Sequence, residues 1–156
     1  MRIAVVVGHS PGSQGAVAVD GVQEWAWHSV LAEQLRGALL DRGQPVAIFQ
    51  RSDGRYSHAM HELVAAVNAW QPGLVLSLHF NAAPESHKGR FSGTEALHWP
   101  TSPRGKHYAG ELASAAARTI ATRNRGAKGR DISHGKVPLY ILQDTAAPMM
   151  YVREGE

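Results

Sequence analysis

The stretch that decides the fold is Leu74-Val75-Leu76-Ser77-Leu78-His79-Phe80, an apolar run with one histidine near its end. Short apolar runs of this length are typical of strands that are buried on both faces of a sheet. A second such run, Ile3 to Val7, opens the chain and is followed at once by Gly8 and His9. Both runs are therefore predicted to be buried strands, each with a histidine at or just past its carboxyl end.

Helical patterns alternate with strand patterns along the rest of the chain. Three helices are expected, at about Gln23–Asp41, from a cap at Ser57 to Trp70, and from the Ser102-Pro103 start signal to about Arg123. The remaining segments are expected to be strands at Pro45–Phe49, Thr94–Trp99, Leu139–Leu142 and Met149–Val152, and a glycine-rich basic loop at Asn124–Lys136. This alternation predicts an α/β fold: a single domain with a mostly parallel twisted sheet of about six strands and helices on both faces.

The composition limits the chemistry that is possible. The 156 residues include no cysteine, which excludes disulfides and thiolate ligands, so a metal would need histidine, aspartate or glutamate. The net charge of +3 favours anionic partners without choosing among them. We expect no nucleic-acid partner, because no stacking aromatic residues are interleaved with the basic loop. We also expect no transmembrane segment, because no stretch approaches the ~20 apolar residues that a membrane span requires.

Two histidines and one glutamate are predicted to meet at one edge of the sheet, because ligands of open α/β sheets bind beyond the carboxyl ends of the strands. His9 follows the first strand, His79 ends the third, and Glu24 lies where the first loop enters its helix. Such a set is a known catalytic zinc set that leaves a fourth position for water. Spacing alone leaves other interpretations open, with His9 as a turn residue and His79 as a hydrogen-bonded core residue. His28, one turn after Glu24, is expected to be a bystander.

Short motifs along the chain surround and include His9, Glu24 and His79. The motifs are Val7-Gly8-His9, Gly21-Val22-Gln23-Glu24, Arg51-Ser52-Asp53, Val67-Asn68, Ser77-Leu78-His79-Phe80-Asn81-Ala82, Gly93-Thr94-Glu95, and Leu139-Tyr140-Ile141-Leu142 followed by Pro148. In this order they resemble the zinc-dependent N-acetylmuramoyl-L-alanine amidases of bacterial wall hydrolases and phage endolysins. The hexapeptide that begins at Ser77 is the most specific of them.

The resemblance implies roles for particular residues. His9, Glu24 and His79 would bind Zn²⁺. Asn81 would not bind the metal itself but would help to orient the ligands. His134 lies in the loop near the predicted active edge, where it is expected to hydrogen-bond the substrate or the oxyanion.

The sequence departs from the family at the catalytic base. The family places a glutamate five residues after a proline, but the fifth residue after Pro148 is Arg153, and Glu154 comes one residue later. A shift of one residue turns a side chain to the other face of a regular strand. A bulge at or just before Gly155 would restore the aim, and Glu154 is expected to be the base; the other interpretation is an altered or disabled base. The family usually continues into a closing helix, whereas this sequence ends at Glu156.

The resemblance implies a single catalytic amidase domain over residues 1–156, acting on peptidoglycan at the amide between N-acetylmuramic acid and the L-alanine of the stem peptide. The first apolar run is too short for a signal peptide, so we expect a protein made in the cytoplasm that reaches the cell wall after release, as an endolysin does. The oligomeric state is left open.

Two alternatives remain open at this point. One is a zinc-retaining wall-binding pseudoenzyme, which Arg153 favours because it stands where the family has its base. The other is a zinc hydrolase of carboxypeptidase type, whose mark would be a guanidinium clamp for a substrate carboxylate.

Overall fold

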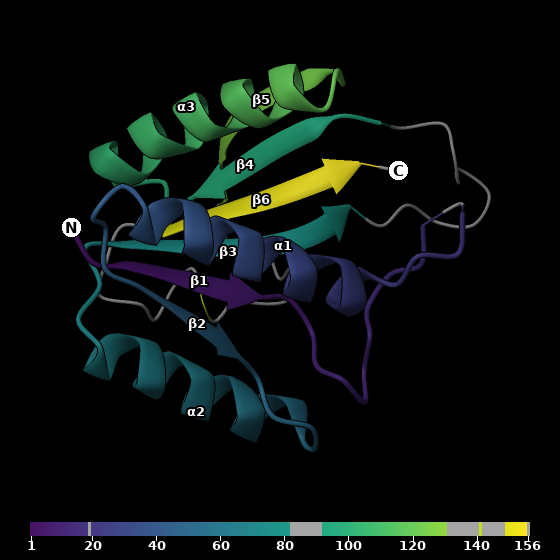
Figure 1. The fold of residues 1–156 in the computed structure, drawn as a ribbon, viewed down its shortest axis with the longest axis vertical. Helices are drawn as coiled ribbons and strands as arrows, with labels where there is room; N and C mark the ends of the chain where they lie inside the picture. Colours follow the sequence, from purple (N-terminus) through teal and green to yellow (C-terminus); the bar gives the residue numbers. More distant parts are fainter. Residues whose placement is uncertain (19, 82–91, 131–140, 142–148, 156) are drawn as a thin grey trace.

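The computed structural model describes residues 1–18, 20–81, 92–130, 141 and 149–155, and at 81 and 149–155 it describes the backbone alone. Its elements are, in chain order, β1 (Ile3–Val7), α1 (Glu24–Leu40), β2 (Val46–Gln50), α2 (Tyr56–Ala69), β3 (Leu74–Asn81), β4 (Thr94–His98), α3 (Pro103–Thr119), β5 (Asn124–Gly129) and β6 (Met149–Gly155). The strands form one six-stranded sheet in the order β2-β1-β3-β6-β4-β5 (Figure 1). Every neighbouring pair is parallel except β4 and β6, which run antiparallel.

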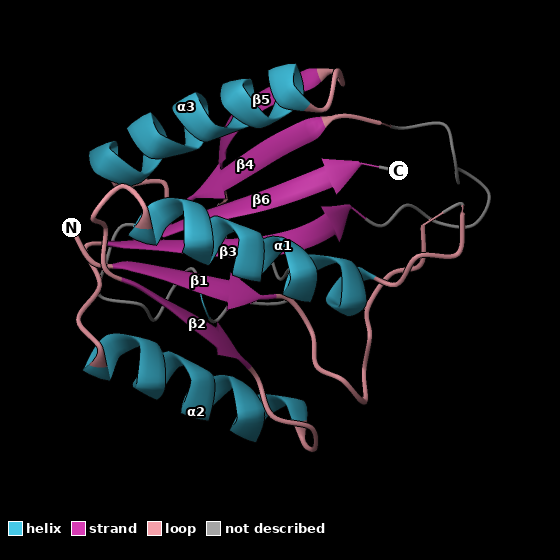
Figure 2. Ribbon diagram, viewed as in Figure 1, coloured by secondary structure: helices cyan, strands magenta, loops and turns pink. Residues whose placement is uncertain are grey.

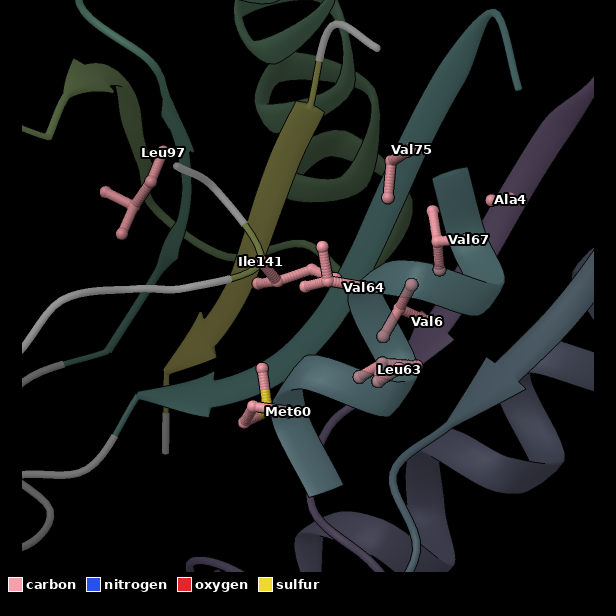
Figure 3. Close-up of a cluster of buried hydrophobic side chains, with 9 residues drawn as sticks. All are labelled: Ala4, Val6, Met60, Leu63, Val64, Val67, Val75, Leu97 and Ile141. Carbon is pink, nitrogen blue, oxygen red and sulfur yellow. The ribbon is translucent and has the colours of Figure 1, made fainter. Parts of the chain in front are cut away.

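Helices cover both faces of this sheet (Figure 2). On one face the core contains side chains of α1 and α3 together with Ile3, Val5, Val7, Leu76 and Leu78. On the other face α2 packs against the alternate strand positions, in a cluster of Ala4, Val6, Met60, Leu63, Val64, Val67, Val75, Leu97 and Ile141 (Figure 3). The predicted α/β class, with a mostly parallel sheet between two helical layers, is confirmed. Within the described ranges, no helix is both long and apolar enough to cross a membrane.

The position of β1 in the interior of the sheet explains why its apolar run was informative. All five residues of β1 are buried, and they alternate between the two core clusters. β1 lies between β2 and β3, with Val7 opposite Leu78 in the register. A strand that is central and covered on both faces needs apolar residues at every position, which is the pattern at the start of the chain.

Three predictions about the elements were wrong. Asn124–Gly129 is an edge strand, not a loop, although asparagine and glycine have low strand propensity. Ile141, the one described residue of the strand predicted at 139–142, is helical, because a short apolar run does not distinguish strand from helix. Arg55, not Ser57, occupies the cap position of α2. The cap predicted at Ser102 is confirmed, since its hydroxyl accepts the Gly105 N–H at 3.0 Å.

Tertiary contacts account for the unexpected strand β5. Its backbone pairs with β4, and its basic side chains reach the carboxylate of Glu95, which is 4% exposed. Lys128 and Arg125 both contact Oε2 of that glutamate. Part of the basic stretch that the sequence favours as a solvated loop therefore neutralises a buried carboxylate.

Candidate metal centre

Three residues that are far apart in the sequence meet at the carboxyl edge of the sheet. His9 follows β1, His79 lies near the end of β3, and Glu24 is the first residue of α1. Potential ligand atoms of all three lie within 4.8 Å of one another. The two imidazole rings stand edge to face, with centroids 5.4 Å apart. The sequence predicted this convergence from the positions of the three residues at strand and helix ends.

Glu24 is the centre of the cluster and is 2% exposed. Its Oε1 lies 2.9 Å from Nδ1 of His79 and accepts the Phe80 N–H, and its Oε2 lies 3.1 Å from Nε2 of His9 and accepts the Ala16 N–H. Burial alone would raise the pKa of Glu24, but the hydrogen bonds to His79 and His9 outweigh burial and hold that pKa well below its usual range. Glu24 is therefore a carboxylate at any physiological pH.

Two glycines make room for the cluster. A Cβ at Gly8 would lie 2.6 Å from Cε1 of His79, and a Cβ at Gly15 would lie 2.5 Å from both Oε2 of Glu24 and Cδ2 of His9. Gly15 also has a φ of 80°, in the left-handed region that favours glycine. His9 itself has a φ of 67°, which is uncommon for a residue with a side chain. The loop is therefore shaped to bring the His9 ring onto Glu24.

Asp53 ties this loop to the end of β2. Its Oδ1 accepts the Gly12 N–H at 2.9 Å. The Ser10 hydroxyl and then that N–H lower the pKa of Asp53 below its usual value. Ser10 directly follows His9, so the Arg51-Ser52-Asp53 motif anchors the segment that carries one candidate ligand. The sequence singled out this motif without assigning it a role, because only the fold brings residues 10–12 beside residue 53.

The donor set fits a metal with an open coordination site. Two imidazoles and one carboxylate form a hydrolytic zinc set, and ligand atoms bound at about 2.0 Å to a tetrahedral ion lie roughly 3.3 Å apart. One potential ligand atom from each residue lies within 4.8 Å of the others, and the nitrogen–oxygen distances of 3.1 and 2.9 Å run to the two different oxygens of Glu24. The side chains of His9 and His79 are 31% and 16% exposed, so the cluster opens to solvent on the histidine side. Such a set can bind an ion and leave a position for water or a substrate oxygen.

For the other predicted site residues, Asn81, His134 and Glu154, the structure describes the backbone at most. Asn81 ends β3, two residues past His79, and its backbone alone is described. His134 lies outside the described residues. Glu154 lies in β6, which pairs with β3 next to His79.

The pairing of β6 with β3 bears directly on the proposed base. It runs without a register shift from Met149 to Gly155, so the described strand has no bulge that would turn Glu154 towards the metal centre. Position 153 is level with His79, and position 154 is level with Phe80. Positions in one register share a face of the sheet in a regular strand. The backbone therefore aligns Arg153, not Glu154, with the histidine.

His28 is a buried neighbour of the cluster. It is 1% exposed, its ring centroid lies 4.8 Å from that of Phe80, and within the described residues its Nδ1 has no hydrogen-bond partner. Burial lowers the pKa of His28 from 6.5 to about 4, so the ring is neutral at physiological pH.

This shift makes the free energy of unfolding depend on pH. Above pH 6.5 neither the folded nor the unfolded chain protonates His28; below it only the unfolded chain does, until the pH reaches about 4. Stability should therefore fall as the pH drops through that window, by at most about 1.4 kcal/mol per pH unit from this group. His28→Leu should flatten the slope in urea unfolding of metal-free protein. The control His58→Leu, at an exposed position, should not, and an unchanged slope in His28→Leu would contradict the assignment.

Comparisons with known proteins agree with this geometry. The sequence pattern of one family, described as N-acetylmuramoyl-L-alanine amidase, matches residues 3–155. Among solved structures, the catalytic domain of the CD27L endolysin targeting Clostridia difficile is similar at a TM-score of 0.80 and 24% identity, over 97% of this chain and 79% of that one. The CwlD amidase from Clostridioides difficile, solved with the GerS lipoprotein, gives a TM-score of 0.80 at 18% identity, over 98% and 81%.

A third structure is that of a much longer protein. Cwp6 from Clostridium difficile gives a TM-score of 0.82 at 25% identity, covering 97% of this chain and 24% of that one. No curated protein matched the sequence. The family match spans nearly every described element, from β1 to β6, and includes the three clustered residues. The chain therefore belongs to the N-acetylmuramoyl-L-alanine amidase family.

Proposed function

We propose that this family member is a zinc-dependent peptidoglycan amidase of endolysin type. It would hydrolyse the amide between the lactyl group of N-acetylmuramic acid and the L-alanine of the stem peptide. The observation that supports this most directly is Glu24, a buried carboxylate with an imidazole on each oxygen at the carboxyl edge of the sheet. The endolysin role rests on the resemblance at the sequence level.

In the proposed reaction, the metal and the side chains of the protein have different roles. Zinc bound by His9, Glu24 and His79 would supply a Lewis acid that polarises the scissile carbonyl and lowers the pKa of the attacking water. Glu24 keeps its negative charge and fixes both imidazoles, so the chain holds the donor set ready. Glu154 is proposed to accept the proton of the water and pass it to the leaving amine, which requires the end of β6 to depart from its regular pairing with β3.

One observation favours a second candidate function. Arg153 is level with His79 in the unbroken register of β6, at the position where the family has its glutamate. A chain that keeps the metal ligands but lacks a base would bind cell walls and not cleave them. Wall pull-down and lysis, measured on the same preparation, separate this pseudoenzyme from an amidase.

The products of digestion test the bond that is cut. Purified walls treated with the protein should gain new N-terminal alanine and no new reducing sugar ends, because the proposed cut frees the amine of L-alanine. Protein stripped with a chelator should release none, and added zinc should restore release. New reducing ends would identify a glycosidase, which needs a pair of carboxylates across the sugar bond. Release of single C-terminal amino acids would instead identify an enzyme of carboxypeptidase type.

A further inference from the structure

A small cavity lies beside the histidines on the face of the sheet that α2 covers. Its volume is about 60 Å³. The polar side chains that line it belong to His9, Arg51, Tyr56, Ser77 and His79. A single water needs roughly 10–15 Å³ of such space, so the cavity can hold a group of a few heavy atoms.

Arg51 brings a positive charge to this cavity. It follows β2 directly and is 8% exposed, and its guanidinium carbon lies 5.5 Å from the centre of the Tyr56 ring. Among the described residues, no carboxylate lies within 4 Å of the guanidinium. Asp53 interacts with the charge at longer range, but its carboxylate is exposed and accepts from the Gly12 N–H. A guanidinium that reaches the cavity without a close carboxylate can bind an anionic ligand through charge-assisted hydrogen bonds.

Ser77 supplies a second unsatisfied group in the same cavity. It is 0% exposed, and within the described part of the chain its hydroxyl has no hydrogen-bond partner. It lies on β3, two residues before His79, and on the same face of the sheet. Among the described residues, no carboxylate lies close to the guanidinium and the hydroxyl has no hydrogen-bond partner, so both groups can donate to one bound carboxylate.

We infer that this cavity is a carboxylate subsite in which Arg51 and Ser77 bind a free carboxylate on the peptide side of the scissile amide. The inference rests on the proposed function, because the cavity shares His9 and His79 with the metal centre. The ligand class is a stem peptide whose second residue carries a free carboxylate. The same peptide with a carboxamide at that position would leave the guanidinium uncompensated, so it should bind more weakly.

The decisive experiment uses two soluble muropeptides that differ only in this group, a carboxylate or a carboxamide. The wild type should cleave the carboxylate form with a KM about 10- to 100-fold lower than that of the amide form. Arg51→Gln should remove most of this preference by raising the KM for the carboxylate substrate, and Ser77→Ala should reduce it. Arg55→Gln is the matched control, because it removes the same charge from an exposed position four residues away and should leave the preference intact.

Binding distinguishes failure of the subsite from failure of the proposed function. Calorimetry of the two peptides on wild-type protein needs no turnover and no variant that might misfold. Tighter binding of the carboxylate peptide, without cleavage of either, would support the subsite and refute the amidase. Equal affinity and equal KM for both peptides would overturn the subsite even if both are cleaved. An Arg51→Gln variant that folds and keeps the wild-type preference would also overturn it.

Discussion

Replacing Glu24 with alanine is expected to remove zinc from the protein and abolish lysis of cell walls. Glu24 contacts both histidines and two backbone N–H groups and is 2% exposed, so its removal leaves both imidazoles without the carboxylate that they share. A site with three protein ligands that loses one retains too little to hold the ion. The zinc-to-protein ratio after dialysis and the turbidity of a wall suspension measure the two losses.

The controls separate loss of metal from loss of fold. Glu33→Ala makes the same substitution on the same helix at an exposed side chain and should keep both zinc and activity. His9→Ala removes a candidate ligand whose side chain is 31% exposed, so it tests the same loss with less disturbance to the core. Stoichiometric zinc together with full lysis in a folded Glu24→Ala or His9→Ala protein would show that the three residues are not the ligand set.

The sequence was sufficient to predict the interior strands β1 and β3 and the clustering of His9, Glu24 and His79, because both depend on local patterns. β1 and β3 are buried on two faces, which demands uninterrupted apolar runs. Parallel strands end at a common edge, so a histidine at each strand end predicts a meeting point. The third member, Glu24, was predictable because a loop that follows the first strand must enter its helix at the same edge.

The rest of the site depends on contacts that no local pattern encodes. Gly15 is required because Glu24 and His9 approach it, and Asp53 matters because it meets Gly12 across 41 residues of sequence. Arg51 was part of a recognised motif, yet only the structure places its guanidinium in a cavity with His79.

The secondary structure of β5 also depends on contacts that its local sequence does not encode. Its composition of asparagine, glycine and charged residues argues against a strand, and pairing with β4 overrides that local preference. Ion pairs from Lys128 and Arg125 to Glu95 add to the backbone pairing of β5 with β4. The two basic residues lie about 30 residues from Glu95 in the sequence. A pattern read over a short window cannot include such a partner.

Glu154→Gln is expected to lower the turnover number by roughly 10²–10⁴-fold while zinc content and wall binding stay unchanged, which is the loss typical of a missing general base. Glutamine keeps the size of the side chain but cannot accept the proton of the attacking water at neutral pH. Glu111→Gln, at an exposed position on α3, is the matched control and should have wild-type turnover.

The Glu154→Gln variant is a strict test of the proposed base, because the backbone register of β6 does not align Glu154 with the metal centre. A regular β6 aligns position 154 with Phe80 and position 153 with His79, so Glu154 can serve the metal centre only if the end of the strand departs from that regularity during catalysis. Near-normal turnover of a zinc-loaded Glu154→Gln protein would place the base elsewhere, and Glu95, two strands from His79 in the sheet, would be the next carboxylate to replace. A wild type that binds zinc and walls but never cleaves them would instead mean that Arg153 marks a lost base, and that the protein recognises the wall without hydrolysing it.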